Sequence, residues 1–223
     1  MNSNKLSHQY DSIADTFESV YEKGAQYNRR VYRNLVPTIK GKDVLDIGCG
    51  DGSDCQFFKD QGAKQVYGLD ASKELLDIAT KKYSDIRFEY GVFDSLPHED
   101  NTFDFVFSKY ALQTTEELEP IFKEVHRVLK TGGTFTFLVA HPIRQFYEKK
   151  RIGKDYFKKE VVDSVCFDGL LTFKEPTHTL KEYFSTFMMT HFTLELFEEQ
   201  FDPAAEKIVD TYPGYMILQW KKK

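Results

Sequence analysis

The chain has 223 residues, a length that fits one α/β domain with a substantial buried core. Hydrophobic residues make up 41% of the sequence, yet no apolar run reaches the roughly 18 residues of a membrane span, so we expect a globular protein that does not cross a membrane. The net charge of −5 disfavours nucleic acid as a partner, and the first residues lack the apolar core of a signal peptide, which predicts a cytoplasmic location.

The three cysteines, Cys49, Cys55 and Cys166, have no zinc-type spacing and form an odd set. They predict neither a metal site nor a disulfide framework, and we expect them to be reduced. No metal is therefore expected in the functional site.

The segment before the first predicted core strand, residues 1–41, has helical patterning. Apolar side chains recur at the spacing of one helix face, at Tyr10, Ile13, Ala14 and Phe17. A second helix is predicted over 27–35, because Pro37 disfavours helix at the residue before it.

The most informative stretch is VLDIGCGDG, residues 44–52. A continuous apolar run that stops at an acid fits a strand buried on both faces, as in a parallel sheet covered by helices. Glycines at every second position, Gly48, Gly50 and Gly52, let the chain turn sharply and bring its backbone against a ligand. The pattern predicts a strand that ends in a nucleotide-binding loop.

The acids around this loop narrow the choice of ligand. In the dinucleotide fingerprint G-x-G-x-x-G the third glycine opens the helix that carries the pyrophosphate, whereas here it comes one residue early. Asp46 and Asp51 would repel a diphosphate but attract a ligand with a cationic amino group, such as S-adenosylmethionine. The run D-I-G-C-G-D-G, residues 46–52, resembles motif I of the class I S-adenosylmethionine-dependent methyltransferases.

Two further strands follow in the order that this family has. The strand predicted over 65–69 ends at Asp70, where an acid in an open α/β sheet accepts hydrogen bonds from the ribose of NAD or of S-adenosylmethionine. Its alternative role is to cap the helix predicted over 74–83. The strand predicted over 87–92 leads to Phe93 and Asp94, which resemble the family's adenine-binding loop, although Asp94 also suits an ordinary turn.

The fourth and fifth predicted strands complete the resemblance. The strand over 103–108 ends at Ser108 and leads to Tyr110, as in the family's fourth motif, and the run 129–138 resembles the family's glycine turn and fifth strand, with the turn at Gly132 and Gly133. Ligands of parallel sheets sit beyond the carboxyl ends of the strands. We therefore expect one ligand-binding edge that includes Asp46, Asp70, Asp94, Ser108 and His141.

The part after the fifth strand is less familiar. Residues 142–176 are too many for an ordinary connection, and two apolar arms in 161–173 flank Asp168 and Gly169, which predicts a hairpin. A helix is predicted over 179–191 and strands over 193–198 and 215–220, which resemble the family's last helix and its sixth and seventh strands. Residues 141–160 hold seven basic and three acidic side chains, either a solvated face or a lip that draws an anionic substrate.

The resemblance implies a Rossmann-like class I methyltransferase fold of the α/β class, with a seven-stranded, mostly parallel sheet, one antiparallel strand and helices on both faces. Within this single domain it implies four segments: an N-terminal helical lid (1–41), a cofactor-binding core (42–141), a substrate-lid insertion (142–176) and a last helix with the closing strands (177–223).

The resemblance also implies the site. S-adenosylmethionine, which leaves as S-adenosylhomocysteine, would be bound by residues in and around the motifs: Tyr10, Asp46, Gly48, Cys49, Gly50, Asp70, Ala71, Phe93, Asp94 and Ser108. Candidates to line the acceptor pocket are Tyr21, Tyr110 and Tyr147. His178 and His141 are the candidates for a catalytic base or substrate anchor, because an imidazole titrates near neutral pH. A helix cap or a satisfied surface histidine is the alternative role for each.

The function implied is methyl transfer to an oxygen or nitrogen atom of a small molecule by a monomer or homodimer. No acidic cluster resembles the magnesium site of catechol-type O-methyltransferases, so no metal is expected, and the N-P-P-Y motif of amide-nitrogen methyltransferases is absent at 108–111. The alternatives are an NAD-linked oxidoreductase, a non-catalytic regulatory subunit that binds the cofactor, and, among methyltransferases, an RNA or protein acceptor.

Overall fold

The computed structural model describes residues 8–11, 14, 39–149, 154–166, 171–200 and 212–223. The helix predicted over 27–35, Tyr21 and the hairpin turn at Asp168 and Gly169 lie outside these residues. The elements are α1 (His8–Asp11), β1 (Asp43–Ile47), α3 (Ser53–Asp60), β2 (Gln65–Asp70), α4 (Lys73–Lys82), β3 (Arg87–Tyr90), β4 (Phe103–Lys109), η2 (Leu112–Thr114), α5 (Glu119–Val128), β5 (Leu129–Ala140), α6 (Pro142–Glu148), β6 (Val161–Cys166), β7 (Leu171–Pro176), α7 (Leu180–Tyr183), α8 (Thr186–His191), β8 (Phe192–Gln200) and β9 (Tyr215–Lys222).

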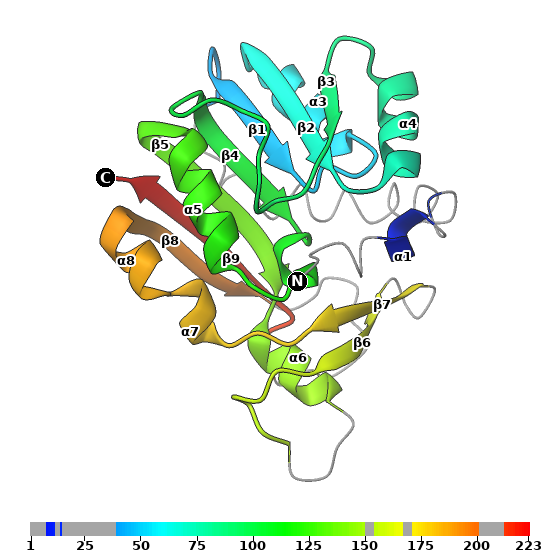
Figure 1. The fold of residues 1–223 in the computed structure, drawn as a ribbon, viewed down its shortest axis with the longest axis vertical. Coiled ribbons are helices and arrows are strands. Elements are labelled where there is room, and N and C mark those ends of the chain that lie inside the picture. The colour runs from blue at the N-terminus through cyan, green and yellow to red at the C-terminus, as the bar shows by residue number, and fades with distance from the viewer. Residues whose placement is uncertain (1–7, 12–13, 15–38, 150–153, 167–170, 201–211) are drawn as a thin grey trace.

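The main sheet has seven strands in the order β3-β2-β1-β4-β5-β9-β8 (Figure 1). The pairs among β1 to β5 are all parallel, and β9 runs antiparallel to both of its neighbours, β5 and β8. Chain order reverses between β1 and β4, and ligands of such sheets bind beyond the carboxyl ends of the strands at this point. This confirms the predicted sheet with one antiparallel strand.

The sheet is buried on both faces. Along β5, Phe135, Phe137 and Val139 join one core cluster with the apolar side of α5 and with α7 and α8, whereas Leu138 joins the opposite cluster with α3 and α4. Strands covered on both faces read as continuous apolar runs rather than alternating ones, which is why the core strands were visible in the sequence. None of the described helices is long and apolar enough to span a membrane.

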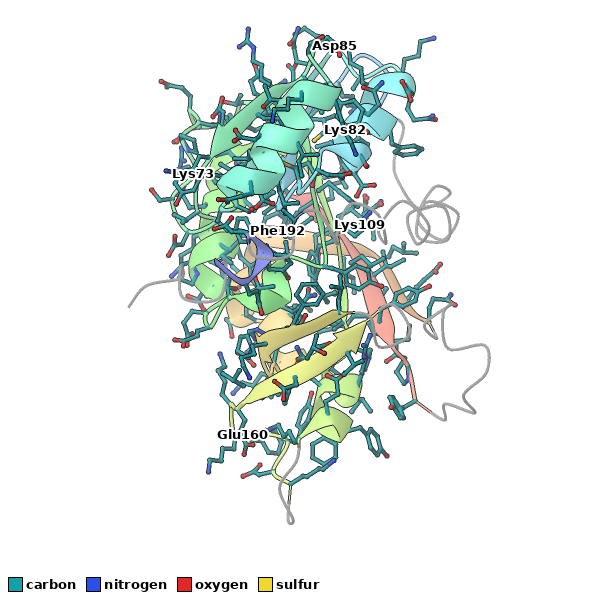
Figure 2. All side chains as sticks on the ribbon, turned by 90° about the vertical axis from the view of Figure 1, so that its right-hand side faces the viewer. Lys73, Lys82, Asp85, Lys109, Glu160 and Phe192 are labelled. Atoms are coloured by element: carbon teal, nitrogen blue, oxygen red, sulfur yellow. The ribbon has the colours of Figure 1, made fainter. Side chains whose placement is uncertain are left out.

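The segment after β5 forms α6 and an antiparallel hairpin, in which Val161 lies opposite Pro176 and Cys166 opposite Leu171. The hairpin prediction is confirmed for both strands. In Figure 1 the hairpin lies beyond the carboxyl end of β4, next to α1. Figure 2 gives the same arrangement from the side, with Lys109 at the end of β4 between α4 and Glu160, which precedes the hairpin. The hairpin therefore covers the ligand-binding edge of the sheet.

The predicted single helix over 179–191 is wrong, because two short helices occupy it. Thr179 caps α7 in a capping box with Glu182, and the Ser185 hydroxyl accepts a hydrogen bond from the Met188 N–H and so starts α8. A serine that caps the next turn offers the backbone an alternative to continuing the helix. The predicted glycine turn before the fifth strand also differs from the structure. Gly132 and Gly133 lie within β5, at the point where the pairing of β5 with β4 shifts register.

Candidate active site

The glycine loop between β1 and α3 has a backbone that other residues adopt with strain. Gly48, Gly50 and Gly52 all have positive φ, at 80°, 52° and 79°. A Cβ on Gly48 would lie 2.2 Å from the Cβ of Ala111, and one on Gly52 would lie 2.6 Å from the Phe88 ring. At Gly50 the nearest atom would be 4.0 Å away. The loop is thus packed tightly at both ends and borders open space at its middle.

Asp70, the last residue of β2, fixes the far side of this loop. Its carboxylate accepts hydrogen bonds from the Gly50 and Ser72 N–H groups, each at 2.8 Å. Ser72 caps α4 by accepting from the Leu75 N–H at 3.2 Å, so the alternative role of Asp70 as the helix cap is wrong. Burial raises the pKa of Asp70, although the backbone hydrogen bonds oppose the rise.

The two acids of motif I have different surroundings. Asp46 is 1% exposed, and among the described residues its Oδ1 has no hydrogen-bond partner, while Oδ2 accepts from the Cys55 thiol at 3.6 Å. Burial raises the pKa of Asp46 well above its usual range. Asp51 accepts from Ser53 at the start of α3 and pairs with Lys82 at 3.3 Å, so its charge is compensated within the protein.

The other predicted cofactor residues lie close to the loop or support it. The Phe93 ring would lie 3.4 Å from a Cβ on Gly48, and Asp94 beyond it is exposed. The buried Ser108 hydroxyl donates to the Ile47 carbonyl at 2.9 Å and so joins β4 to β1. The Cys49 thiol is buried, and burial raises its pKa to about 11, so this thiol is an inert wall of the loop.

The end of β4 holds a strained residue next to the loop. Tyr110 has φ of 52°, in the left-handed region, and its N–H donates to the Leu138 carbonyl at 2.8 Å. Such conformations persist where the surroundings hold them, often at functional sites. Here the turn brings Ala111 against Gly48 and places η2, with Gln113, directly beside the glycine loop.

The two candidate histidines have different environments. His141 Nδ1 accepts from the Ile143 N–H at 3.0 Å and caps α6, while its Nε2 lies 2.8 Å from Glu199. Burial lowers the pKa of His141. His178 is equally buried, at 1% exposure, but only its Nδ1 has a partner, Glu182 at 3.3 Å; its Nε2 has none among the described residues. Only His178 therefore has a ring nitrogen available to a ligand.

His178 belongs to a buried polar group that we call the Glu175 cluster: Gln113, Gln145, Glu175, His178 and Tyr183. Glu175 accepts from the side-chain amides of Gln113 at 3.4 Å and of Gln145 at 3.5 Å. The Gln145 amide also accepts from the His178 N–H at 2.9 Å, and the His178 and Tyr183 rings lie 5.7 Å apart. Residues from η2, α6 and β7 thus meet at one point under the hairpin.

This cluster is incompletely satisfied. Within the described part of the chain, buried atoms without a hydrogen-bond partner include Gln113 Oε1, His178 Nε2 and the Tyr183 hydroxyl. Burial raises the pKa of Glu175 to about 7. Buried polar groups are normally paired, so several unpaired ones together indicate a ligand site. Sequence reasoning found His178 but missed Gln113, Gln145 and Glu175, because nothing in their local pattern shows that three separate segments converge.

Helix α1 connects the hairpin with the cofactor side. The Gln9 amide donates to the Lys174 carbonyl at 3.2 Å and accepts from the Lys174 N–H at 2.8 Å, and Tyr10 stacks on Phe173 with centroids 5.0 Å apart. Asp11 accepts from the Ser72 hydroxyl at 2.6 Å. Tyr10 therefore packs on β7, next to Asp11, which contacts the Asp70 turn; its contact with the cofactor stays a prediction.

Other candidates lie away from the cluster. Tyr147 on α6 is 53% exposed and stacks on Tyr212. The basic side chains of 144–159 that the structure describes mostly bind within the protein: Arg144 pairs with Glu148, Lys149 is buried against backbone carbonyls, and Lys159 pairs with Glu182. Arg144, Lys149 and Lys159 are therefore engaged within the protein, and the role of the basic segment as an anion-attracting lip stays a prediction.

Comparison with known families agrees with this geometry. The family model described as "Methyltransferase domain" matches residues 45–137, which include the glycine loop, Asp70 and β4. Residues 45–137, less than half of the chain, therefore match a methyltransferase domain. The crystal structure of an S-adenosylmethionine-dependent methyltransferase from Mesorhizobium loti superposes with a TM-score of 0.73 at 25% identity, covering 86% of this chain and 96% of that one.

Relatives that match this part of the chain have names that differ in the acceptor atom. A malonyl-[acyl-carrier protein] O-methyltransferase of Hamiltonella defensa is 37% identical over 56% of this chain and 51% of its own length. Phosphoethanolamine N-methyltransferase 2 of Caenorhabditis elegans is 32% identical over 49% of this chain and 26% of its own. The chain thus spans about half or less of these relatives, and the acceptor must be inferred from the site.

The residues around the glycine loop fit S-adenosylmethionine, the cofactor that the matched domain and the Mesorhizobium loti structure imply. The open side of Gly50 leaves room for a ligand against the backbone, and the buried Asp46 Oδ1, without a donor among the described residues, matches a cationic amino group. Asp70 already orients the loop and borders the same space. The described residues contain no group of histidines, cysteines and acids that could hold a metal ion.

Proposed function

We propose that the protein transfers the methyl group of S-adenosylmethionine to an oxygen or nitrogen atom of a small molecule, which binds between the glycine loop and the Glu175 cluster. The observation that carries this proposal is the buried, unpaired Nε2 of His178, in a cluster whose Gln113 lies two residues from Ala111, the neighbour of Gly48. Buried, unpaired groups next to a cofactor loop suit a bound acceptor.

Each part of the chain has a role in this reaction. When bound, S-adenosylmethionine supplies an electrophilic methyl group on a sulfonium. Asp70, with Asp46 and the glycine loop, binds and orients it, while His178 anchors the acceptor or removes its proton. The hairpin and α1 exclude water from above, held together by the contacts of Gln9 and Tyr10 with β7. Positioning and desolvation then supply much of the rate.

The depth of the cluster supports a small acceptor. Every member of the Glu175 cluster is at most 3% exposed, which leaves no surface on which a folded macromolecule could present a reactive atom. The net charge of −5 likewise disfavours RNA. An NAD-linked oxidoreductase is disfavoured by the buried Asp46 at the loop, because a diphosphate there would meet an acid.

The test is calorimetry followed by a transfer assay. S-adenosylhomocysteine should bind one site with a Kd on the order of micromolar, and NADH should not bind. Incubation with radiolabelled S-adenosylmethionine and a pool of metabolites should then label a small molecule rather than protein or RNA. Binding of NADH without binding of S-adenosylhomocysteine, or label found only in macromolecules, would overturn the proposal.

A further inference from the structure

Glu175 is a buried carboxylate without an ion-pair partner among the described residues; the nearby Arg144 guanidinium pairs with Glu148 and lowers the pKa of Glu175, but burial outweighs this effect. The Glu175 side chain is 3% exposed, and no lysine, arginine or histidine in the described ranges forms an ion pair with it. The equally buried Asp54 shows the usual solution, since it pairs with Lys109. Buried charges are ordinarily paired, so the uncompensated position of Glu175 requires a reason.

The groups around Glu175 are mostly hydrogen-bond acceptors. Its two protein donors are neutral amides at 3.4 and 3.5 Å, at the outer limit for a hydrogen bond. Beside them, Gln113 Oε1 and Glu148 Oε2 are buried acceptors with no donor in the described part of the chain. Two buried carboxylates and an amide oxygen, with only weak amide donors to Glu175, match a ligand that donates several hydrogen bonds and carries positive charge.

The site lies where an acceptor of the methyl group would have to be. Gln113 follows the turn that packs Ala111 on Gly48, and Glu175 precedes His178 by three residues on the same strand exit. Glu148, whose charge acts on Glu175, also lines a cavity of about 450 Å³ beside the hairpin. Gln113 therefore places the cluster near the cofactor loop, and Glu148 links it to a cavity whose other lining residues come from 158–163 and Lys174.

We propose that the methyl acceptor is an amine, which Glu175 and Gln113 Oε1 bind as its ammonium form and from which the Glu175 carboxylate takes the proton. This inference rests on the proposed function. A hydroxyl compound would donate a single hydrogen bond and leave the buried charge uncompensated, and a carboxylate substrate would be repelled by Glu175 and Glu148.

The step balances in the following way. Glu175 accepts a proton from the ammonium, which frees the nitrogen lone pair. That lone pair forms the new nitrogen–carbon bond to the methyl group, and the carbon–sulfur bond breaks with its electron pair remaining on sulfur. Burial supports this role, because a carboxyl pKa of about 7 instead of the ordinary 4.5 makes the carboxylate roughly 300-fold more basic.

Carbon-13 NMR on the full chain tests the binding half without turnover. With glutamate labelled at the side-chain carboxyl carbon, the Glu175 signal is assigned by its loss in Glu175→Gln. Methylammonium, the smallest primary ammonium probe, should lower the titration midpoint of that signal by about one pH unit or more at saturation, because a cation favours the ionised form. Methanol, its uncharged counterpart, should leave it in place. An unchanged midpoint with methylammonium overturns the proposal.

A transfer assay tests the chemical half. With radiolabelled S-adenosylmethionine, a panel of primary amines and the matched alcohols should give labelled amines only. Glu175→Gln should lower that rate about 100-fold or more while its affinity for S-adenosylhomocysteine stays within twofold, and Glu195→Gln, a control on the edge strand β8, should keep the wild-type rate. Labelled alcohols without labelled amines, or full activity of Glu175→Gln, overturn the amine proposal but leave methyl transfer intact. Loss of S-adenosylhomocysteine binding by the wild type would instead refute the proposed function.

Discussion

The Glu175→Gln substitution makes a quantitative prediction about stability, independent of any substrate. Burial raises the pKa of Glu175 from 4.5 to about 7. Between these two pH values the Glu175 carboxyl is therefore mostly ionised in the unfolded chain and mostly protonated in the folded one. Below pH 4.5 the carboxyl is protonated in both states and costs nothing. As pH rises through 4.5 the unfolded state gains from ionisation first, and the full cost is reached above pH 7.

From these two pKa values, linkage gives a destabilisation of about 1 kcal/mol at pH 5 and about 3 kcal/mol at pH 8. A glutamine cannot ionise, so the variant should gain about 2 kcal/mol relative to wild type between these two pH values. The contacts of the new amide with Gln113 and Gln145 change the free energy of unfolding by the same amount at pH 5 and at pH 8. This change therefore cancels in the difference between the two pH values.

The assay is urea unfolding of both proteins at pH 5 and pH 8, followed by fluorescence and circular dichroism. Glu195→Gln, which replaces a glutamate outside the cluster on the sheet edge, should show a pH-dependent difference below about 0.5 kcal/mol. If Glu175→Gln gains no more stability than this control between pH 5 and pH 8, then Glu175 is not a buried, uncompensated acid and the reasoning about the cluster fails.

Four further outcomes are expected. Asp70→Ala should weaken S-adenosylmethionine binding by roughly 1.5 to 3 kcal/mol in calorimetry, because the carboxylate binds or orients ligand groups; unchanged affinity would reduce it to a turn residue. Gly48→Ala should lower the free energy of unfolding by roughly 2 kcal/mol or more and impair cofactor binding, whereas Gly132→Ala, with φ of 75° but no atom within 4 Å of a Cβ, should cost only about 1 kcal/mol. His141→Ala should cost about 1 kcal/mol of stability as a lost cap, with activity kept, whereas His178→Gln, which leaves a smaller cavity than alanine would at this buried site, should lower methyl transfer about 100-fold while S-adenosylhomocysteine binding is kept. Activity should survive a chelator; a loss that magnesium restores would contradict the predicted absence of a metal.

The sequence predicted the sheet and the cofactor loop because their information is local. An apolar run buried on both faces, followed by glycines at alternate positions, permits few other structures, and the positive φ values at Gly48, Gly50 and Gly52 show why no other residues fit there. The break between α7 and α8 was missed because the capping role of Ser185 does not differ, in sequence, from a serine on a helix surface.

The acceptor site was only partly predictable because it is assembled over long sequence distances. Gln113 and Glu175 are 62 residues apart, and Gln145 reaches Glu175 from α6. A glutamine in η2 or a glutamate in an alternating hairpin strand has no local sign of burial. His141 and His178 looked alike as histidines near prolines, and only their partners separate a helix cap from a side chain with a free nitrogen.

The central claim is that the methyl group is presented to the Glu175 cluster. A crystal structure of the full chain with S-adenosylhomocysteine measures this most directly, through the distance from the ligand sulfur to the Glu175 carboxylate and to His178 Nε2. If the acceptor atom contacts the methyl group on sulfur and is hydrogen-bonded to Glu175 or His178, at least one of these two distances must be within roughly 8 Å. A sulfur atom more than roughly 12 Å from both groups would contradict the account.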